Sequence, residues 1–160
     1  MPRDVEHFVA WRILWYVYQR LRIIQQANGY NCDAAVFLDV EAYRQSSDKF
    51  ALFVYSDGEG PDDQLVGGGN GSPRVHSRMN ITINASIKYD LDMPARAQMQ
   101  LEQDVKTALQ TGVSGMRTLV GTGVSFSWGE CQRFVTSLTA EREAGFSLSC
   151  SFLYPQGSTW

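Results

Sequence analysis

Hydrophobic side chains recur at helical spacing near the start of the chain, and this pattern predicts a first helix over residues 5–27. Asp4 is a suitable N-cap, and Asn28 with Gly29 supplies a left-handed stop at the other end. Six apolar positions form one broad arc that is expected to face the core: Ile13, Leu14, Val17, Tyr18, Leu21 and Ile24.

A second flank of this helix also carries apolar side chains. Phe8, Trp11 and Trp15 fall within a narrow arc on the side that also holds Arg12 and Arg22. Two interpretations stay open: strands of the same chain cover this aromatic patch, or it forms a subunit interface, where Trp and Arg are favoured. All five residues are therefore candidates for a subunit interface.

Period-two alternation predicts the strands. Residues 34–40 and 50–55 are short and rich in β-branched and aromatic side chains, so they are expected to be neighbouring strands. Residues 75–89 alternate most clearly between apolar and polar positions, which indicates one dry face and one wet face. Residues 146–154 alternate in the same way, with serines on the polar side.

A second helix is predicted between these alternating segments, from Pro94 to Gln110. Asp92 precedes it, proline suits a first turn, and Gly112 is expected to end it. Its apolar stripe consists of Met99, Leu101, Val105, Ala108 and Leu109. Glycines divide the following residues into three further short strands, expected at 117–120, 124–128 and 133–137.

The order of these elements predicts an α+β fold, because alternating β and α units are lacking. The expected architecture is a mixed, largely antiparallel sheet with the two main helices packed on one side. The chain has 160 residues, of which 44% are hydrophobic and 12% aromatic, and it shows no internal repeat. One domain over residues 1–160 accounts for this size and composition.

A glycine-rich stretch interrupts this domain at residues 56–74 and is expected to be a flexible loop. Residues 56–72 hold six glycines and several acids without Lys or Arg, which favours solvation over a fixed conformation. The stretch is longer than a simple connection needs, so it is a candidate docking loop. Its candidate contact residues are Asp57, Glu59, Asp62, Asp63, Leu65 and Arg74.

Charge and cysteine content narrow the class of protein. The formal net charge is −3, from 14 basic and 17 acidic residues, so the chain lacks the basic stripe of a tight polyanion binder. No secretory signal is expected, because the opening residues lack a small-residue cleavage site. No membrane segment is expected either, because the most apolar window, residues 8–24, is short for a bilayer span and is interrupted by arginines. Cys32, Cys131 and Cys150 lie far apart and are expected to be reduced thiols in a cytoplasmic protein.

No motif predicts catalysis. The glycines from Gly67 to Gly71 lack the Lys-Ser/Thr ending of a phosphate-binding loop. His7 and His76 lie in unrelated segments, and neither is spaced as a metal ligand or as the base of a nucleophile. We therefore expect no enzyme activity, no catalytic residue, no metal and no cofactor.

Several segments follow one another in an order that resembles a known family. They are Ala27-Asn-Gly-Tyr30, Leu38-Asp-Val-Glu41, the glycine-rich loop, Asn84-Ala-Ser-Ile-Lys-Tyr89, Leu101-Glu-Gln-Asp-Val-Lys-Thr-Ala-Leu109, and a closing strand that ends in Tyr154-Pro155. In this order the chain resembles the tail terminator proteins of long-tailed bacteriophages, also called tail completion or minor tail proteins. None of these segments is a catalytic signature, so the resemblance rests on their order along most of the chain.

The resemblance implies a structural virion protein, made in the host cytoplasm, that assembles as a ring, usually a hexamer. The ring would cap the head-proximal end of the tail tube, terminate tube polymerisation and join the tail to the head-completion or neck proteins. DNA would pass through its lumen. Two alternatives stay open: another head–tail connector protein, or a small cytoplasmic enzyme with a lid at residues 56–74.

Overall fold

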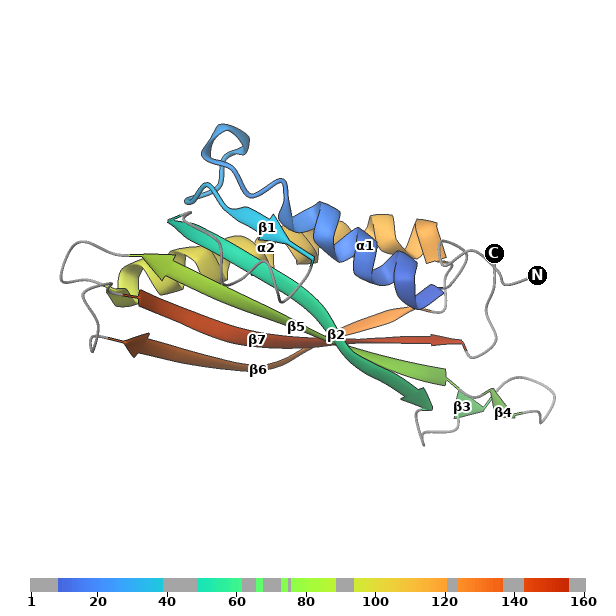
Figure 1. Ribbon diagram of the computed structural model, residues 1–160. Helices are drawn as coiled ribbons and strands as arrows, with labels where there is room; N and C mark the ends of the chain where they lie inside the picture. The colour runs from blue at the N-terminus through green and yellow to red at the C-terminus, as the bar shows by residue number, and fades with distance from the viewer. Residues whose placement is uncertain are drawn as a thin grey trace, which may run out of the picture.

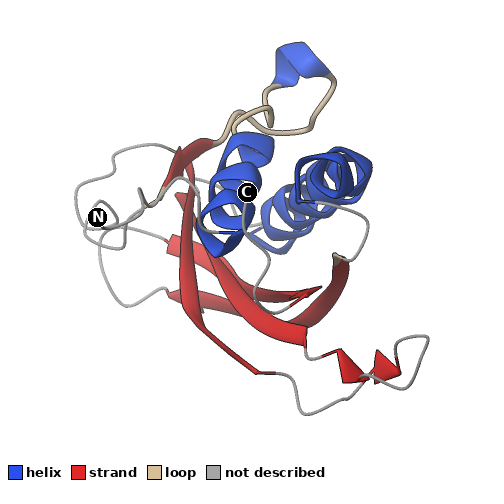
Figure 2. Cartoon of the chain, turned by 90° about the vertical axis from the view of Figure 1, so that its right-hand side faces the viewer, coloured by secondary structure: helices blue, strands red, loops and turns tan. Residues whose placement is uncertain are grey.

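A computed structural model shows two helices side by side on one face of a curved sheet (Figures 1 and 2). The structure describes residues 9–38, 49–61, 66–67, 73–74, 76–88, 94–120, 124–136 and 143–155. Two-layer packing of this kind lets each amphipathic helix bury its apolar stripe against the apolar side of the sheet. The predicted α+β class, with a mixed sheet and two main helices, is confirmed.

The described elements follow one another along the chain in this order: α1 Val9–Leu21, η2 Gln26–Asn28, β1 Ala35–Phe37, β2 Phe50–Pro61, β3 Val66–Gly67, β4 Pro73–Arg74, β5 His76–Lys88, α2 Pro94–Val120, β6 Ser125–Thr136 and β7 Glu143–Pro155. The main sheet has the strand order β1-β2-β5-β7-β6. Only β1 and β2 pair in parallel, and the other neighbours are antiparallel. A separate two-stranded ladder joins β3 and β4.

The core lies between the sheet and the helices, where the alternation predicted it. On β5, Ile81, Ile83, Ala85 and Ile87 are buried, and on the neighbouring strand β7 every second residue from Phe146 to Tyr154 is buried with them. The helices contribute a row from α1 and a row from α2: Val9, Ile13, Val17 and Leu21, and Leu101, Val105, Ala108 and Leu109. Burying each large aliphatic side chain contributes about 1.5 to 3 kcal/mol, so this layer dominates the stability of the fold.

The first helix is shorter than predicted. It ends at Leu21 instead of residue 27, because the chain turns there and places Ile24 in the core. The Ile24 N–H donates to the Leu21 carbonyl (3.1 Å), and the Ile24 carbonyl accepts from the Ala34 N–H (3.0 Å). Gly29, at φ 90°, supplies the predicted left-handed stop, but for η2 rather than for the helix. Residues 5–8 and the Asp4 cap lie outside the described residues.

The prediction of a flexible loop over residues 56–74 is also wrong at its start, because residues 56–61 continue β2. They pair with β5 as far as the Pro61 and Ser77 positions. Asp57 is the extra residue of a bulge, and Gly58 adopts φ 119° to restore the pairing. Glycines and acids are poor strand formers, so their local preference is overridden here by pairing with a long neighbouring strand.

Two further expectations based on glycine are corrected. The second helix continues through Gly112 and Gly115 to Val120, so the strand expected at 117–120 is helical. A helical glycine costs only about 1 kcal/mol, which the packing of a long helix offsets. The strands expected at 124–128 and 133–137 are one strand, β6, with a bulge at Gly129, where a Cβ would collide with the Ser149 side chain.

Candidate interaction surfaces

An aromatic row runs along α1. The rings of Trp11 and Trp15 stack with their centroids 6.0 Å apart, and the Trp15 and Tyr18 centroids are 5.3 Å apart. The Arg22 guanidinium carbon, just after the helix, lies 5.6 Å from the centre of the Tyr18 ring. Contacts of this kind orient the rings and the cation against one another. We call these four residues the α1 aromatic row.

The aromatic row faces away from the second helix. On the opposite flank of α1, Arg20 donates from Nε to the Ala108 carbonyl (3.1 Å) and from Nη2 to Thr111 Oγ1 (2.8 Å). At about 100° per residue, the three aromatic residues lie roughly 140 to 180° around the helix from Arg20. The row is therefore presented at the outer side of the helical layer.

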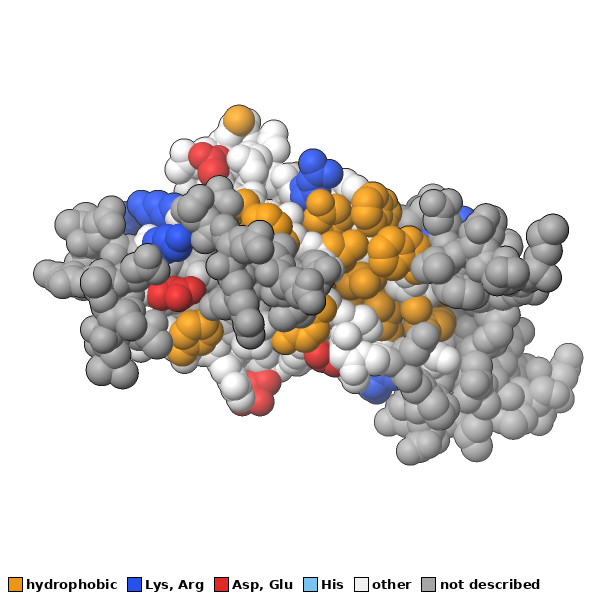
Figure 3. All heavy atoms as spheres, in the orientation of Figure 1, with side chains coloured by type: hydrophobic (Ala, Val, Ile, Leu, Met, Phe, Trp, Pro, Cys, Tyr) orange, Lys and Arg blue, Asp and Glu red, His pale blue; other side chains and the backbone are white. Residues whose placement is uncertain are grey.

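Solvent reaches this row in the subunit. Trp15 is 44% exposed, whereas Trp11 and Tyr18 are half-buried, so the fold leaves a large part of the Trp15 indole uncovered. Figure 3 shows hydrophobic side chains gathered over α1. An exposed tryptophan with stacked aromatic neighbours has the composition of an interface anchor.

The structure brings together most of the interface candidates predicted from the sequence. Trp11, Trp15 and Arg22 belong to the aromatic row, while Arg12 is half-buried on the adjoining side of α1. Phe8 lies outside the described residues. Tyr18, which the periodicity assigned to the core arc, is only half-buried and instead connects Trp15 to Arg22.

A second exposed apolar surface lies where α2 begins and β6 ends. Met99 is 56% exposed, Phe134 41% and Val135 49%. The side chain of Gln98 donates from Nε2 to the Phe134 carbonyl (2.7 Å), so the start of α2 lies beside the end of β6. Val135 is paired with the buried Ala144 and points to the helix side, whereas Phe134 is paired with Gly145 and its ring lies against that glycine on the outer face of the sheet. We call Met99 and Val135, on the helix side, the α2–β6 corner. The prediction that Met99 belongs to the buried stripe is wrong, since the helix turns this residue outward beside the sheet edge.

The docking-loop candidates do not form one cluster in the described residues. Asp57 lies in the β2 bulge, where its carboxylate accepts a hydrogen bond from the Thr82 hydroxyl. Glu59 belongs to β2, and Arg74 belongs to β4 and is paired with Val66. The β3–β4 ladder lies at the opposite end of the molecule from η2 (Figure 1). Asp62, Asp63 and Leu65 lie outside the described residues.

Two buried carboxylates on α2 have structural roles that the sequence did not reveal. Asp104 accepts hydrogen bonds from the backbone N–H groups of Asn31 and Cys32 at 2.9 to 3.1 Å, and from Asn31 Nδ2 at 2.8 Å. It therefore anchors the segment after η2 to the second helix. The only sequence signal was an acid placed inside an apolar stripe.

The second carboxylate, Glu102, forms ion pairs with Lys106 (3.0 Å) and with Arg133 of β6 (2.7 Å). Burial raises the pKa of Glu102, but the hydrogen bonds from Lys106 and Arg133 outweigh it, and the pKa lies below its ordinary value. Glu102 is therefore a charged link between α2 and the edge strand.

The thiols are not activated. Burial raises the pKa of Cys150 to about 12, and burial together with the Asp104 charge raises the pKa of Cys32 to about 12. Burial and the Glu102 charge also raise the pKa of Cys131. A thiol with a raised pKa stays protonated near neutral pH and is a poor nucleophile. In the described ranges, no three His, Cys, Asp or Glu side chains form a group that could hold a metal ion.

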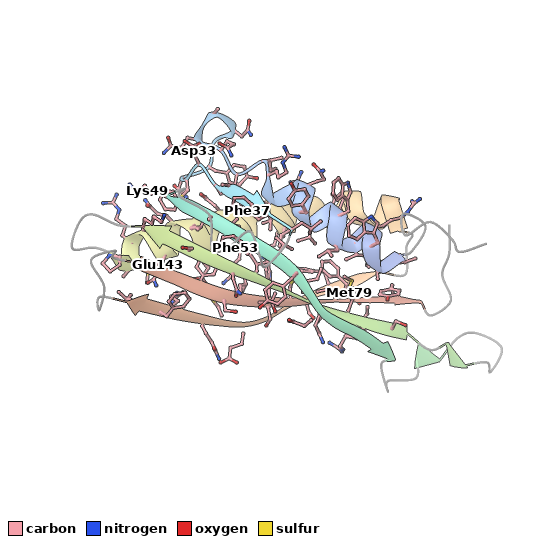
Figure 4. The ribbon with its side chains drawn as sticks, in the orientation of Figure 1. Asp33, Phe37, Lys49, Phe53, Met79 and Glu143 are labelled. Atoms are coloured by element: carbon pink, nitrogen blue, oxygen red, sulfur yellow. The ribbon has the colours of Figure 1, made fainter. Side chains whose placement is uncertain are left out.

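The sheet face opposite the helices is largely polar. Its side chains hydrogen-bond across strands, for example from Asn84 Nδ2 to the Tyr55 hydroxyl (3.1 Å) and from Arg78 Nη1 to Ser151 Oγ (3.2 Å). Near β1, the stacked rings of Phe37 and Phe53 lie 5.3 Å apart and supply an apolar part of this face (Figure 4). Polar side chains on neighbouring strands thus pair with one another on this face.

The sequence was compared with protein-family models and with curated proteins. No family model matches the chain, and no curated protein matches it at a significant level. None of the described helices is long and apolar enough to cross a membrane. The fold defines the chain as a two-layer α+β protein with exposed apolar side chains on α1, on α2 and at the end of β6.

Proposed function

We propose that this protein is a structural subunit of a phage tail that assembles as a hexameric ring at the head-proximal end of the tail tube. The ring terminates tube polymerisation and joins the tail to the head-completion or neck proteins. Its place in the virion follows from the resemblance in segment order. The observation that carries the assembly role is the exposed α1 aromatic row.

Leaving the apolar surface of this row in water costs free energy, and assembly would remove that cost. Trp and Tyr are the most frequent anchors of protein interfaces, because a rigid ring buries much apolar area with little loss of rotamer entropy. A monomeric protein has no need to stack two tryptophans on its outer flank, and Trp15 is nearly half exposed. Covering the row with another subunit removes this apolar surface from water.

The net charge of the chain and the raised pKa values of its thiols favour a DNA conduit over an enzyme. A net charge of −3 without a basic stripe suits passage of DNA, because tight neutralisation of phosphates would hold the polymer in place. The thiol pKa values above the ordinary value leave Cys32, Cys131 and Cys150 poorly suited to nucleophilic attack. Residues 56–61 belong to β2 instead of a lid, which weakens the enzyme alternative.

The β2 extension and the β3–β4 ladder are the proposed contact with the tube or the neck. They lie at one end of the molecule, away from the aromatic row's helical flank, so a ring closed through α1 leaves them accessible (Figure 1). Asp57, Glu59 and Arg74 are carried by these strands.

A tube-capping assay tests this function. The purified protein is added to the polymerising tail tube protein of the same virus, and tube lengths are measured by electron microscopy. We expect shorter tubes with density for the protein at one end, and loss of this effect with Trp15→Ala. A matched surface variant, Ala27→Ser, should keep it, because Ala27 is exposed on η2, at the opposite end of the molecule from the β3–β4 ladder and outside the row (Figure 1). Tubes of unchanged length with no protein at either end would contradict the proposal.

A further inference from the structure

The connection between α1 and β1 forms a polar lobe that projects beyond the helical layer (Figures 1 and 2). We call residues 23–34, which contain η2, the η2 lobe. Connections between elements usually take about 4 to 6 residues, so this one is longer than the passage from helix to strand requires. Ile24 and Cys32 anchor its two ends in the core, and residues 26–29 between them are exposed and polar or small. The exposed part of the lobe therefore depends on hydrogen bonds for its shape.

Side-chain amides supply these hydrogen bonds. Gln26 Nε2 donates to the Asn31 carbonyl (3.1 Å), and Asn28 Nδ2 donates to the Ile23 carbonyl (2.9 Å). Asn31 Nδ2 donates to Asp104 of α2 (2.8 Å), and the same carboxylate accepts from the backbone N–H of Asn31. These bonds fix the lobe in one conformation, so a partner can bind it without the entropy cost of ordering a loop.

The same bonds turn donors inward and leave acceptors at the surface of the lobe. Gln26, Asn28 and Asn31 are exposed, and in the part of the chain that the structure describes none of their amide oxygens accepts a hydrogen bond. Asp33, which lies on the lobe (Figure 4), accepts the Gln26 N–H at one carboxylate oxygen (2.7 Å). Residues 23–34 contain no Lys or Arg, so Asp33 supplies their only charge. The lobe therefore presents acceptors together with one negative charge.

Lys and Arg side chains are the chemical complement of such a surface. Each carries several N–H donors, no acceptor and a positive charge. Complementary charges across an interface speed association and disfavour wrong partners. Nucleic acid has the opposite chemistry, because its phosphates are negatively charged acceptors. The chemistry of the lobe therefore favours a basic protein surface.

We propose that the η2 lobe is a preformed docking element for a protein surface rich in Lys and Arg, and that this surface belongs to the axial neighbour that the β3–β4 ladder does not contact. A ring that joins the tail tube to the neck needs two contacts along the tail axis. The lobe and the ladder lie at opposite ends of the molecule (Figure 1). This inference rests on the proposed function and assigns one end of the subunit to each partner.

Variants at the two ends of the molecule test this assignment. Binding to the tail tube protein and to the head-completion protein of the same virus is measured separately by biolayer interferometry, over a range of NaCl concentrations. Ala27→Arg adds a cation and bulk to the exposed lobe without removing a side-chain hydrogen bond, and Ala27→Ser is its matched control. Asp33→Asn removes the charge but keeps an oxygen that can accept the Gln26 N–H. Arg74→Glu changes the ladder at the other end.

We expect Ala27→Arg to weaken binding to one of the two proteins by roughly tenfold or more, and Asp33→Asn to weaken binding to the same protein by roughly threefold and to reduce its salt dependence. Arg74→Glu should weaken binding to the other protein. Ala27→Ser should bind both proteins as the parent does. Thermal unfolding of each variant checks that it is folded.

Three results would overturn the inference. Ala27→Arg weakens binding to neither protein or to both, it weakens binding to the same protein as Arg74→Glu does, or salt leaves the binding of the lobe's partner unchanged. Self-association of the parent that Ala27→Arg abolishes would also overturn it, because the occupant of the lobe would then be a second copy. A parent subunit that binds neither protein contradicts the proposed function, and this inference with it.

Discussion

Replacing Trp15 with alanine separates assembly from folding. In the subunit, nearly half of Trp15 is in water, and its ring packs against the rings of Trp11 and Tyr18. Each aromatic pair contributes about 0.5 to 1.5 kcal/mol, so Trp15→Ala should lower the free energy of unfolding of the monomer by about 1 to 2 kcal/mol. A fully buried tryptophan would cost about 3 to 5 kcal/mol.

The same substitution should weaken assembly more strongly. If Trp15 is an interface anchor, its loss costs on the order of 2 kcal/mol or more per contact. A loss of about 2 kcal/mol raises the dissociation constant of each contact roughly 30-fold. Each subunit of a ring contributes one such contact to its neighbour, so ring formation should shift to much higher protein concentration.

Two measurements on the same variants decide between these effects. Thermal unfolding at a concentration where the parent is monomeric reports folding, and native mass spectrometry across a concentration series reports assembly. Gln19→Ala, on the same helix, should change neither, whereas Ile13→Ala should lower the unfolding midpoint because Ile13 is completely buried. A drop for Trp15→Ala as large as that for Ile13→Ala would show that Trp15 is packed inside its own subunit, and would refute the interface assignment.

Three further predictions concern the subunit itself. Asp104→Ala should lower the free energy of unfolding by about 2 to 4 kcal/mol in a denaturant titration, because it leaves the buried Cys32 N–H without its acceptor and removes the bonds from Asn31; Asp104→Asn, which keeps one acceptor oxygen, should cost less, and equal losses would contradict this role. The pKa of Glu102 is lowered in the folded state, so its charge stabilises the protein above about pH 4.5. This contribution is about 1 kcal/mol, because Lys106 and Arg133 are partly in water, and it is lost as the pH falls through the folded pKa. Glu102→Gln should therefore flatten the acid limb of stability against pH, and an unchanged limb would count against the ion pairs with Arg133. Amides of residues 56–61 that pair with β5 should be protected in hydrogen exchange, and exchange as fast as in an unfolded peptide would contradict the β2 extension.

The alternating strands could be predicted from the sequence nearly to the residue. β5 and β7 each bury every second side chain, so the period of two marks both the strand and its core face. The apolar stripes of both helices were also predictable, because burial against one sheet imposes a period of 3.6. Fold class followed from the order of these segments.

Glycine was the main source of error, because its local preference does not decide the outcome inside a well-packed element. Gly112 lies within α2 and Gly129 within β6, although both were expected to end an element, and Gly58 lies within β2, although it was expected to belong to a loop. Gly129 is in fact required by a close approach of two strands, and Gly58 by a bulge. These roles depend on the neighbouring strand, which the local sequence does not specify.

The candidate site was predictable only in part. Trp11 and Trp15 could be assigned to a common flank from their spacing, since residues four apart share one side of a helix. The α2–β6 corner had no such signal, because periodicity identifies apolar faces but not which of them lie at an uncovered sheet edge. Met99 was assigned to the core for this reason, and Phe134 and Val135 were assigned to an ordinary strand.

Cryo-electron microscopy of the parent virion tests the central claim most directly. We predict a hexameric ring of this protein at the end of the tail tube next to the head, with α1 of each subunit at the boundary to its neighbour and DNA or an open lumen on the axis. Density for the protein at the distal end of the tail, within the head, or nowhere in the particle would contradict the account.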